Sequence, residues 1–175
     1  DDVVIVDQLS HASIIDGRLL SRSTFQRFKH NDLDDLRRLL ENASEKYKGK
    51  LVIVDAVYSM DGDVCPLPEL VALCREFDAW LVVDEAHSLG VLGETGHGIL
   101  EYFNMSPDDV ELLTGSLSKT IPAVGGFVAG KRDVIQFLRH NARAFVFSAA
   151  LPPAAVAAVT ASLEVIEEEP WRIKA

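Results

Sequence analysis

The segment Leu81-Val82-Val83-Asp84-Glu85-Ala86-His87 is a short apolar run that ends in an acidic residue, with a histidine close behind. An apolar run of this length between helical segments predicts a buried strand of a parallel sheet. Asp84 then stands at the end of the strand, and His87 follows three residues later. Because ligands of open α/β sheets bind outside the carboxyl ends of the strands, the segment predicts both a fold class and the place of a site.

Apolar runs alternate with amphipathic segments along the rest of the chain. We expect strands at residues 3–6, 51–54, 80–83, 110–114, 127–129 and 145–147. We expect helices after Ser10 as N-cap and at residues 32–48, 68–77, 131–140 and 154–168. This alternation predicts an α/β fold, a three-layer sandwich with a mainly parallel sheet. No repeat or linker divides residues 1–175, which we interpret as one domain core.

The composition narrows the class of protein. The chain has 175 residues, of which 48% are hydrophobic and 25% charged, as in an ordinary globular domain. Its net charge of -10 argues against a general nucleic-acid-binding surface. No apolar run approaches the roughly 20 residues of a membrane-spanning helix. Cys65 and Cys74 do not form a CxxC pair, so we expect free thiols, no metal site and a cytoplasmic location.

A second motif, Gly115-Ser116-Leu117-Ser118-Lys119-Thr120, places a lysine in a loop of small residues after the next predicted strand. A lysine amine forms an imine with an aldehyde, and a carboxylate such as Asp84 can keep a pyridine nitrogen protonated. These two abilities together predict an enzyme that uses pyridoxal 5'-phosphate (PLP). Ser59 also follows a predicted strand, so three strand ends carry candidate polar groups.

Two other motifs compete for the same residues. Asp84 to His87 spells a helicase motif, and Gly125 to Lys131 nearly matches a phosphate loop, but Arg132 replaces the required Ser or Thr and the order is reversed. Ser116 to Lys119 matches the S-x-x-K of penicillin-binding enzymes, whose companion motifs are absent. Taken singly, His11 would be a surface or capping histidine and Ser59 a turn residue.

In order, the motifs resemble the PLP-dependent α-oxoamine synthases of fold type I. The matching stretches are Ser10 to Gly17, Phe28 to Asp32, Val57 to Asp63, Asp84 to Gly90, Gly115 to Lys119, Gly125-Gly126 and Phe147 to Pro153. The stretches Leu67 to Leu70, Glu101 to Phe103 and Pro107 to Val110 are most similar to serine palmitoyltransferases. The resemblance implies condensation of an amino acid with an acyl thioester of CoA or acyl carrier protein, usually with decarboxylation, by a homodimer.

The resemblance also implies a role for each candidate residue. Lys119 would be the Schiff-base lysine and later a proton-transfer base. Asp84 would hold the proton on the pyridine nitrogen, and His87 would lie near the phenolic oxygen of the cofactor or the substrate. These three are the expected catalytic residues, and all three also contact the cofactor.

Three more residues would complete the cofactor site. His11 would stack on the pyridine ring, Ser59 would lie near the phenolic oxygen, and Ser116 would donate a hydrogen bond to the phosphate. Members of the family are much longer, so we interpret the chain as the core of the large domain, without its first part and without the small C-terminal domain. Ala149-Ala150, where hydroxyl residues are common, leaves open a non-catalytic subunit of the same fold. Another fold type I enzyme, such as an aminotransferase, is the remaining alternative.

Overall fold

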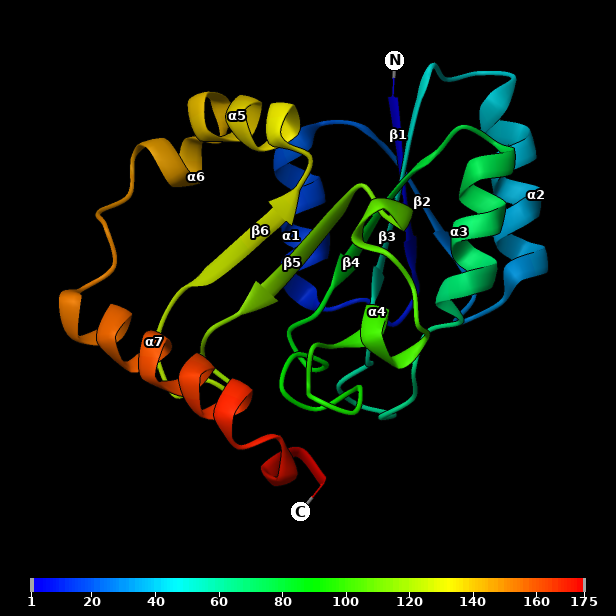
Figure 1. The fold of residues 1–175 in the computed structure, drawn as a ribbon. Coiled ribbons are helices and arrows are strands. Elements are labelled where there is room, and N and C mark those ends of the chain that lie inside the picture. The colour runs from blue at the N-terminus through cyan, green and yellow to red at the C-terminus, as the bar shows by residue number, and fades with distance from the viewer. Residues whose placement is uncertain (1, 175) are drawn as a thin grey trace. The chain divides into compact units, whose positions relative to one another are not determined.

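The computed structural model describes residues 2–174, which form two compact units divided between Asp84 and Glu85 (Figure 1). The sheet of the first unit has the strand order β2-β1-β3-β4, and every neighbouring pair is parallel. The four strands are β1 (Asp2–Asp7), β2 (Thr24–Phe28), β3 (Gly49–Asp55) and β4 (Trp80–Asp84). The predicted α/β class with a mainly parallel sheet is confirmed.

Helices cover both faces of this sheet. They are α1 (Ala12–Ser21), α2 (Leu33–Ser44) and α3 (Leu67–Glu76). The step from β1 to β2 runs in one direction across the sheet, and the later steps run in the other. Right-handed connections therefore place α1 on one face and α2 with α3 on the opposite face. Figure 1 shows α2 and α3 side by side, away from α1. The first unit is thus a three-layer sandwich, as expected.

The sequences of these elements explain their structure. β1 is a run of β-branched residues, and Val3, Ile5 and Val6 are fully buried because both sheet faces are covered. α2 begins after Asp32, whose carboxylate accepts a hydrogen bond from the amide of Asp35 at 2.9 Å. The α2 residues that face the core are Leu36, Leu39, Leu40 and Ala43.

The strand order creates a topological switch point between β1 and β3. The connection from β1 leads to one side and the connection from β3 to the other, so the segments after the two strands diverge. Such a point is where open α/β sheets bind ligands. The carboxyl ends of β1 and β3 are Asp7 and Asp55.

The second unit contains an antiparallel strand pair and short helices. Thr114 and Val128 are opposite each other in this pair. The elements are α4 (Ile99–Tyr102), a 3₁₀ turn (Pro107–Asp109), β5 (Leu112–Ser116), β6 (Gly126–Gly130), α5 (Arg132–Asn141), α6 (Arg143–Val146), α7 (Pro153–Glu168) and a second 3₁₀ segment (Pro170–Lys174). Its buried apolar residues are Ile99, Leu100, Val110, Leu117 and Ile121.

Several local predictions are wrong. The helix expected at 32–48 ends at Ser44. Residues 145–147 do not form a strand: the amides of Phe145 and Val146 both donate to the carbonyl of Ala142, which closes the helical turn of α6. Phe147 is 77% exposed, so this apolar run is not buried by the part of the chain that the structure describes. The strand expected at 110–114 lies at Leu112–Ser116. The N-cap of α1 is His11 and not Ser10.

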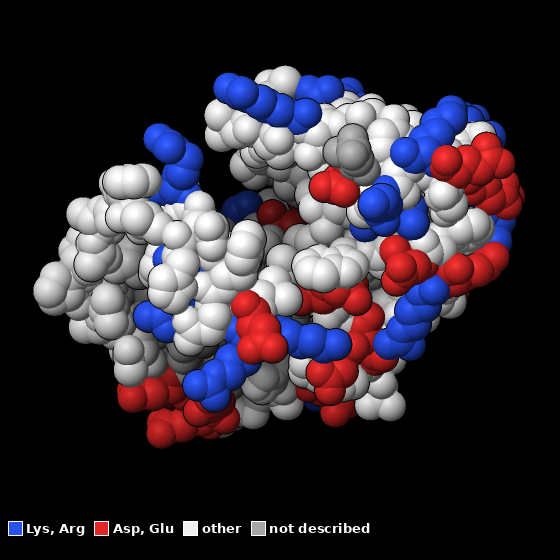
Figure 2. Space-filling model, turned by 90° about the horizontal axis from the view of Figure 1, so that it is seen from above, with Lys and Arg blue, Asp and Glu red and all other residues white. Residues whose placement is uncertain are grey.

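Acidic and basic side chains are interspersed over α2. Arg37 pairs with Glu76 and Arg38 with Asp35, both at 2.5 Å. Figure 2 shows red and blue groups side by side at the right of the view, where Figure 1 places α2. Within residues 2–174, no helix has the length and apolar character needed to cross a membrane.

Candidate functional site

In the first unit, carboxylates stand at the ends of three neighbouring strands. Asp7, Asp55 and Asp84 are the last residues of β1, β3 and β4. Asp55 lies opposite Asp84 in the register of β3 and β4. Asp84 is half-buried at the end of a buried strand, the position that the sequence predicted for it.

Asp55 is a buried carboxyl group that the sequence did not single out. Burial raises its pKa to about 6, and the nearby charge of Asp84 acts in the same direction. The backbone amide of His11 donates to its Oδ2 atom at 3.1 Å, which opposes this rise. Asp55 therefore holds the backbone of His11 at the switch point.

The ring of His11 is exposed at the N-terminus of α1. Its Nδ1 atom accepts a hydrogen bond from the amide of Ser13 at 3.3 Å and lies 2.8 Å from the hydroxyl of Ser13. Because His11 is exposed, a flat aromatic partner has access to its ring. His11 thus caps α1 through Nδ1, and this role leaves the ring available for stacking.

Ser59 is exposed in a tight loop after β3. The amide of Gly62 donates to the carbonyl of Tyr58 at 2.8 Å, and the amide of Tyr58 donates to the carbonyl of Asp63 at 3.1 Å. Gly62 has a φ of 75°, which glycine adopts readily. The loop therefore presents the Ser59 hydroxyl to solvent beyond the carboxyl end of β3.

In the second unit, the structure brings two predicted catalytic side chains together. The Nζ atom of Lys119 lies 2.8 Å from the Nε2 atom of His87. When the ring proton of His87 is on Nδ1, Nε2 accepts a hydrogen bond from the lysine amine. The amine is exposed, as a group that attacks a carbonyl carbon must be.

Ser116 ends β5, and its Oγ atom lies 2.7 Å from Oγ of Ser118. The amide of Ser118 donates to Oγ of Ser116 at 3.2 Å. Two hydroxyl groups at one turn present donors of the kind that a phosphate accepts from.

Glu85, the neighbour of Asp84, has a structural role. It is buried, and its carboxylate accepts hydrogen bonds from the amide of Ile99 at 3.2 Å and from the hydroxyl of Ser88. A Cβ atom at Gly98 would lie 2.4 Å from its Oε2 atom, so the backbone passes close to this carboxylate. Glu85 is therefore unavailable as the second acid of a helicase motif.

The other half of the helicase alternative fails too. The segment from Gly126 to Gly130 is strand β6 and not a phosphate-binding loop, and Lys131 is the N-cap of α5. The near match to a phosphate loop is thus a strand that leads directly into helix α5.

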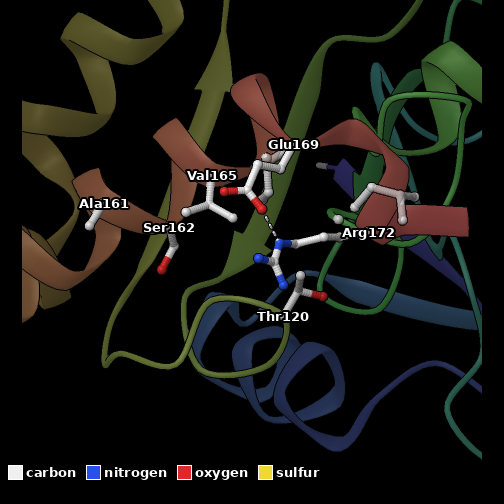
Figure 3. Close-up of a pocket in the computed structure, with 9 residues that line it drawn as sticks. Thr120, Ala161, Ser162, Val165, Glu169 and Arg172 are labelled. Carbon is white, nitrogen blue, oxygen red and sulfur yellow. Dashed lines mark hydrogen bonds and ion pairs between the residues drawn. The ribbon is translucent and has the colours of Figure 1, made fainter. Parts of the chain in front are cut away.

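The second unit also contains a cavity of about 400 Å³ that the sequence did not predict. Its lining residues are Gly90, Thr120, Ala161, Ser162, Val165, Ile166, Glu169, Arg172 and Ile173. Figure 3 shows the Arg172 guanidinium between Thr120 and Glu169. Arg172 forms an ion pair with Glu169. Because Thr120 follows Lys119 directly, the shape of this cavity depends on the lysine loop.

Comparison with known proteins gives the family. The model of the family "Aminotransferase class I and II" matches residues 1–175. The chain is 49% identical over 167 residues to 8-amino-7-oxononanoate synthase of Thermoanaerobacter pseudethanolicus, which covers 95% of this chain and 42% of the relative. It is 46% identical over 170 residues to serine palmitoyltransferase of Sphingobacterium spiritivorum, which covers 97% of this chain and 42% of that protein.

Solved structures agree. Serine palmitoyltransferase from S. paucimobilis, with bound PLP and myriocin, has a TM-score of 0.88 at 37% identity, over 94% of this chain and 42% of that one. 8-Amino-7-oxononanoate synthase from Francisella tularensis has a TM-score of 0.81 at 30% identity, over 99% of this chain and 49% of that one. The chain spans less than half the length of these relatives. It belongs to the aminotransferase class I and II family, and within that family to the α-oxoamine synthases that its motifs resemble.

Proposed function

We propose that the complete protein that carries this chain is a PLP-dependent acyltransferase. It condenses an amino acid with an acyl thioester, of CoA or of acyl carrier protein, to an α-oxoamine, usually with loss of carbon dioxide. The contact of 2.8 Å between Lys119 and His87 carries the proposal, because it pairs an exposed amine with an imidazole at the two motifs that identify the family.

The residues present fit the cofactor. Lys119 supplies an amine for its aldehyde, Asp84 a carboxylate for its pyridine nitrogen, and the hydroxyls of Ser116 and Ser118 donors for its phosphate. The exposed ring of His11 offers a stacking surface. Assignment of all these groups to one cofactor is supported by the order of the motifs and by the relatives. When bound, PLP supplies an electron-accepting ring that stabilises negative charge on the substrate carbon.

The side chains of this chain perform the remaining steps. His87 holds the Nζ atom of Lys119 in a fixed direction before the amino acid arrives. With its amine free, Lys119 would remove and return a proton at the substrate carbon as a general base. Asp84 keeps the pyridine nitrogen protonated throughout. His87 and Ser59 then serve as hydrogen-bonding groups for the phenolic oxygen of the cofactor or for the substrate.

Absorbance and product analysis of the complete protein test this proposal. We expect a visible band after purification with PLP, absent in Lys119→Ala and retained in Lys131→Ala, an exposed lysine outside the site. Serine, glycine and alanine are then added separately, and one of the three should change the visible band. With an acyl thioester, mass spectrometry should then detect an α-oxoamine. Formation of a keto acid with transfer of nitrogen would establish an aminotransferase instead.

Two further properties of the complete protein have separate support: the resemblance supports the first, and the cysteine spacing of the sequence supports the second. We propose that it is a homodimer and that it is located in the cytoplasm. Light scattering of the purified protein at several concentrations tests the first, and cell fractionation tests the second.

A further inference from the structure

His30 connects two carboxylates that are far apart in the sequence. Its Nδ1 atom lies 3.0 Å from Oδ1 of Asp7, and its Nε2 atom lies 2.7 Å from Oδ2 of Asp63. A carboxylate oxygen accepts hydrogen bonds, so a ring that contacts one through each nitrogen donates from both and carries a positive charge. Asp7 is fully buried and the His30 side chain is 18% exposed, which shields the contact from solvent.

Asn31, like His30, connects Asp7 to Asp63. Its backbone amide donates to Oδ2 of Asp7 at 2.8 Å, and its side-chain Nδ2 donates to Oδ2 of Asp63 at 2.8 Å. Asn31 has a φ of 51°, a left-handed conformation that asparagine tolerates better than most residues. The segment after β2 therefore links the end of β1 to the loop after β3, across the switch point.

The loop held in this way carries Ser59. We define the Ser59 loop as residues 57–64, which a bridge between Val57 and Val64 closes at its base. The Tyr58 ring packs edge-to-face on His30, with centroids 4.4 Å apart and an angle of 84°. Tyr58, which contacts His30, directly precedes Ser59 in the loop. Asp63, on the other side of the loop, contacts His30 too.

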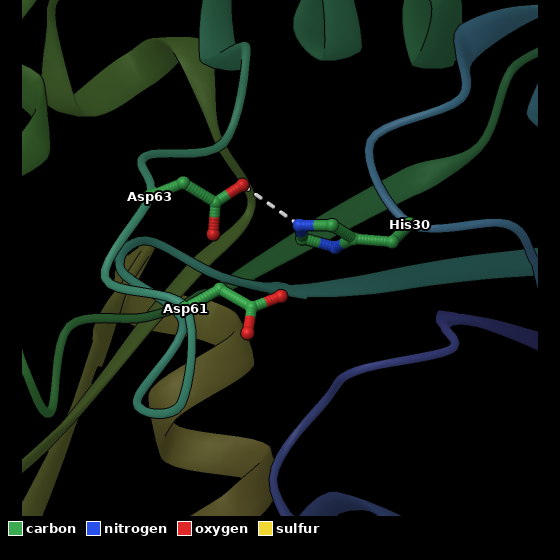
Figure 4. Close-up of side chains that lie close together, drawn as sticks. All are labelled: His30, Asp61 and Asp63. Atoms are coloured by element: carbon green, nitrogen blue, oxygen red, sulfur yellow. Dashed lines mark hydrogen bonds and ion pairs between the residues drawn. The ribbon is translucent and has the colours of Figure 1, made fainter.

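Figure 4 shows His30 with Asp61 and Asp63. One ring nitrogen of His30 and one carboxylate oxygen of each aspartate lie within 4.8 Å of one another, a spacing at which such atoms could hold a metal ion. Both His30 nitrogens already face carboxylates, and Asp61 is exposed. Burial works against charge on the ring, but the hydrogen bonds to Asp7 and Asp63 raise the pKa of His30 above its ordinary value. The cluster is therefore a charged hydrogen-bonded connection between segments.

We propose that His30 is a positioning residue, which sets the place of the Ser59 hydroxyl by tying the Ser59 loop to the end of β1. His30 acts through its contacts with Asp63 and Tyr58, which belong to the loop that carries Ser59. This inference rests on the function proposed above, because that function assigns Ser59 to the phenolic oxygen or the substrate.

Hydrogen exchange of the complete protein without cofactor tests the connection itself. In His30→Gln, which can donate to only one of the two carboxylates, we expect the amides of the Ser59 loop to exchange about tenfold faster. Peptides from β4 should be unchanged. His140→Gln is the matched control, because the His140 ring is exposed on α5 and hydrogen-bonds the Gln136 carbonyl. An unchanged exchange rate of the loop in His30→Gln overturns the proposal.

The visible spectrum with PLP tests the action through Ser59. We expect His30→Gln and Ser59→Ala to shift the band in the same direction, and the double variant to shift it no further than Ser59→Ala alone. Additive shifts would show that His30 does not act through Ser59 and overturn that link. If His30→Gln does not fold, Asp63→Asn weakens the same connection at a side chain that is 41% exposed, and faster loop exchange is again expected. Failure of the proposed function appears separately, as an unaltered band in Lys119→Ala.

Discussion

The amine of Lys119 and the imidazole of His87 lie 2.8 Å apart, between two motifs that are well separated in the sequence. Taken alone, the segment from Asp84 to His87 could be a helicase motif, and the segment from Ser116 to Lys119 could be the S-x-x-K of a penicillin-binding enzyme. The contact between Lys119 and His87 places both motifs in one site, in which the imidazole orients the amine for attack on an aldehyde.

His87→Ala removes the partner of the amine. We expect the variant to fold normally, because the contact is at the surface, and to lose about a hundredfold in kcat. Steady-state kinetics of the complete protein measure this change, with His97→Ala as control, since His97 is an exposed histidine outside the two motifs. Unchanged kcat would restrict His87 to a structural role.

Asp84→Asn replaces the carboxylate assigned to the pyridine nitrogen with a neutral amide. The amide has nearly the same shape, so the fold should persist, but it cannot hold the pyridinium proton by charge. We expect condensation to fall by about a hundredfold or more, with little change in thermal stability. Asp108→Asn, at an exposed position in the 3₁₀ turn Pro107–Asp109, serves as the control. Activity near that of the wild type in Asp84→Asn would remove Asp84 from the mechanism.

Asp55 predicts a pH dependence of stability. Its folded-state pKa of about 6 lies above the ordinary value of 3.8, chiefly because of burial. The folded protein therefore binds this proton more tightly than the unfolded chain, and the free energy of unfolding falls as pH rises from about 4 to about 6. Above pH 6, the ionised Asp55 lowers the free energy of unfolding by about 3 kcal/mol relative to pH 4.

Asp55→Asn removes this titration and keeps an oxygen that can accept from the amide of His11. We expect the variant to be more stable than the wild type at pH 8 by up to about 3 kcal/mol, with no difference near pH 4. Denaturant unfolding across this range checks it. A difference that does not vary with pH would mean that Asp55 is not the titrating group.

Gly90 is required by the lysine loop. It has a φ of 74°, and a Cβ atom there would lie 2.2 Å from Cγ2 of Thr120, the residue after Lys119. We expect Gly90→Ala to lower the free energy of unfolding by about 1–3 kcal/mol and to reduce activity by moving this loop. Gly17→Ala is the matched control: it lies in α1, where a Cβ atom meets nothing within 4 Å, and should stabilise by about 0.5–1 kcal/mol. Equal stability of the two variants would contradict the steric argument.

The parts of the fold that the sequence predicted are those in which local pattern and tertiary packing agree. The β-branched run at 3–6 and the leucines of α2 are buried, as their spacing indicates. The sequence does not predict β2, because Thr24–Phe28 mixes polar and apolar residues, as befits a strand at the edge of the sheet of the first unit. The run at 145–147 has strand-forming residues, but within residues 2–174 it pairs with no strand, and local helical hydrogen bonds determine its conformation.

The same limit applies to the site. Residues such as Lys119 and His87 belong to motifs whose chemistry can be recognised within a few positions. Asp7, His30 and Asp63 form a group only through the fold, because His30 is 23 residues from Asp7 and 33 from Asp63. The role of Asp55 depends on burial and on the neighbouring Asp84, which the order of strands determines. A single sequence contains no local pattern for either arrangement.

The central claim is that Lys119 is the residue that links to PLP. Borohydride treatment of the complete protein loaded with PLP, followed by digestion and mass spectrometry, tests it most directly, because reduction makes the link permanent. We predict that the mass of the reduced cofactor is found on the peptide that contains Lys119, and that Lys119→Ala carries none. Labelling of a different lysine in the wild-type protein, or labelling that persists in Lys119→Ala at the same level, would contradict the claim.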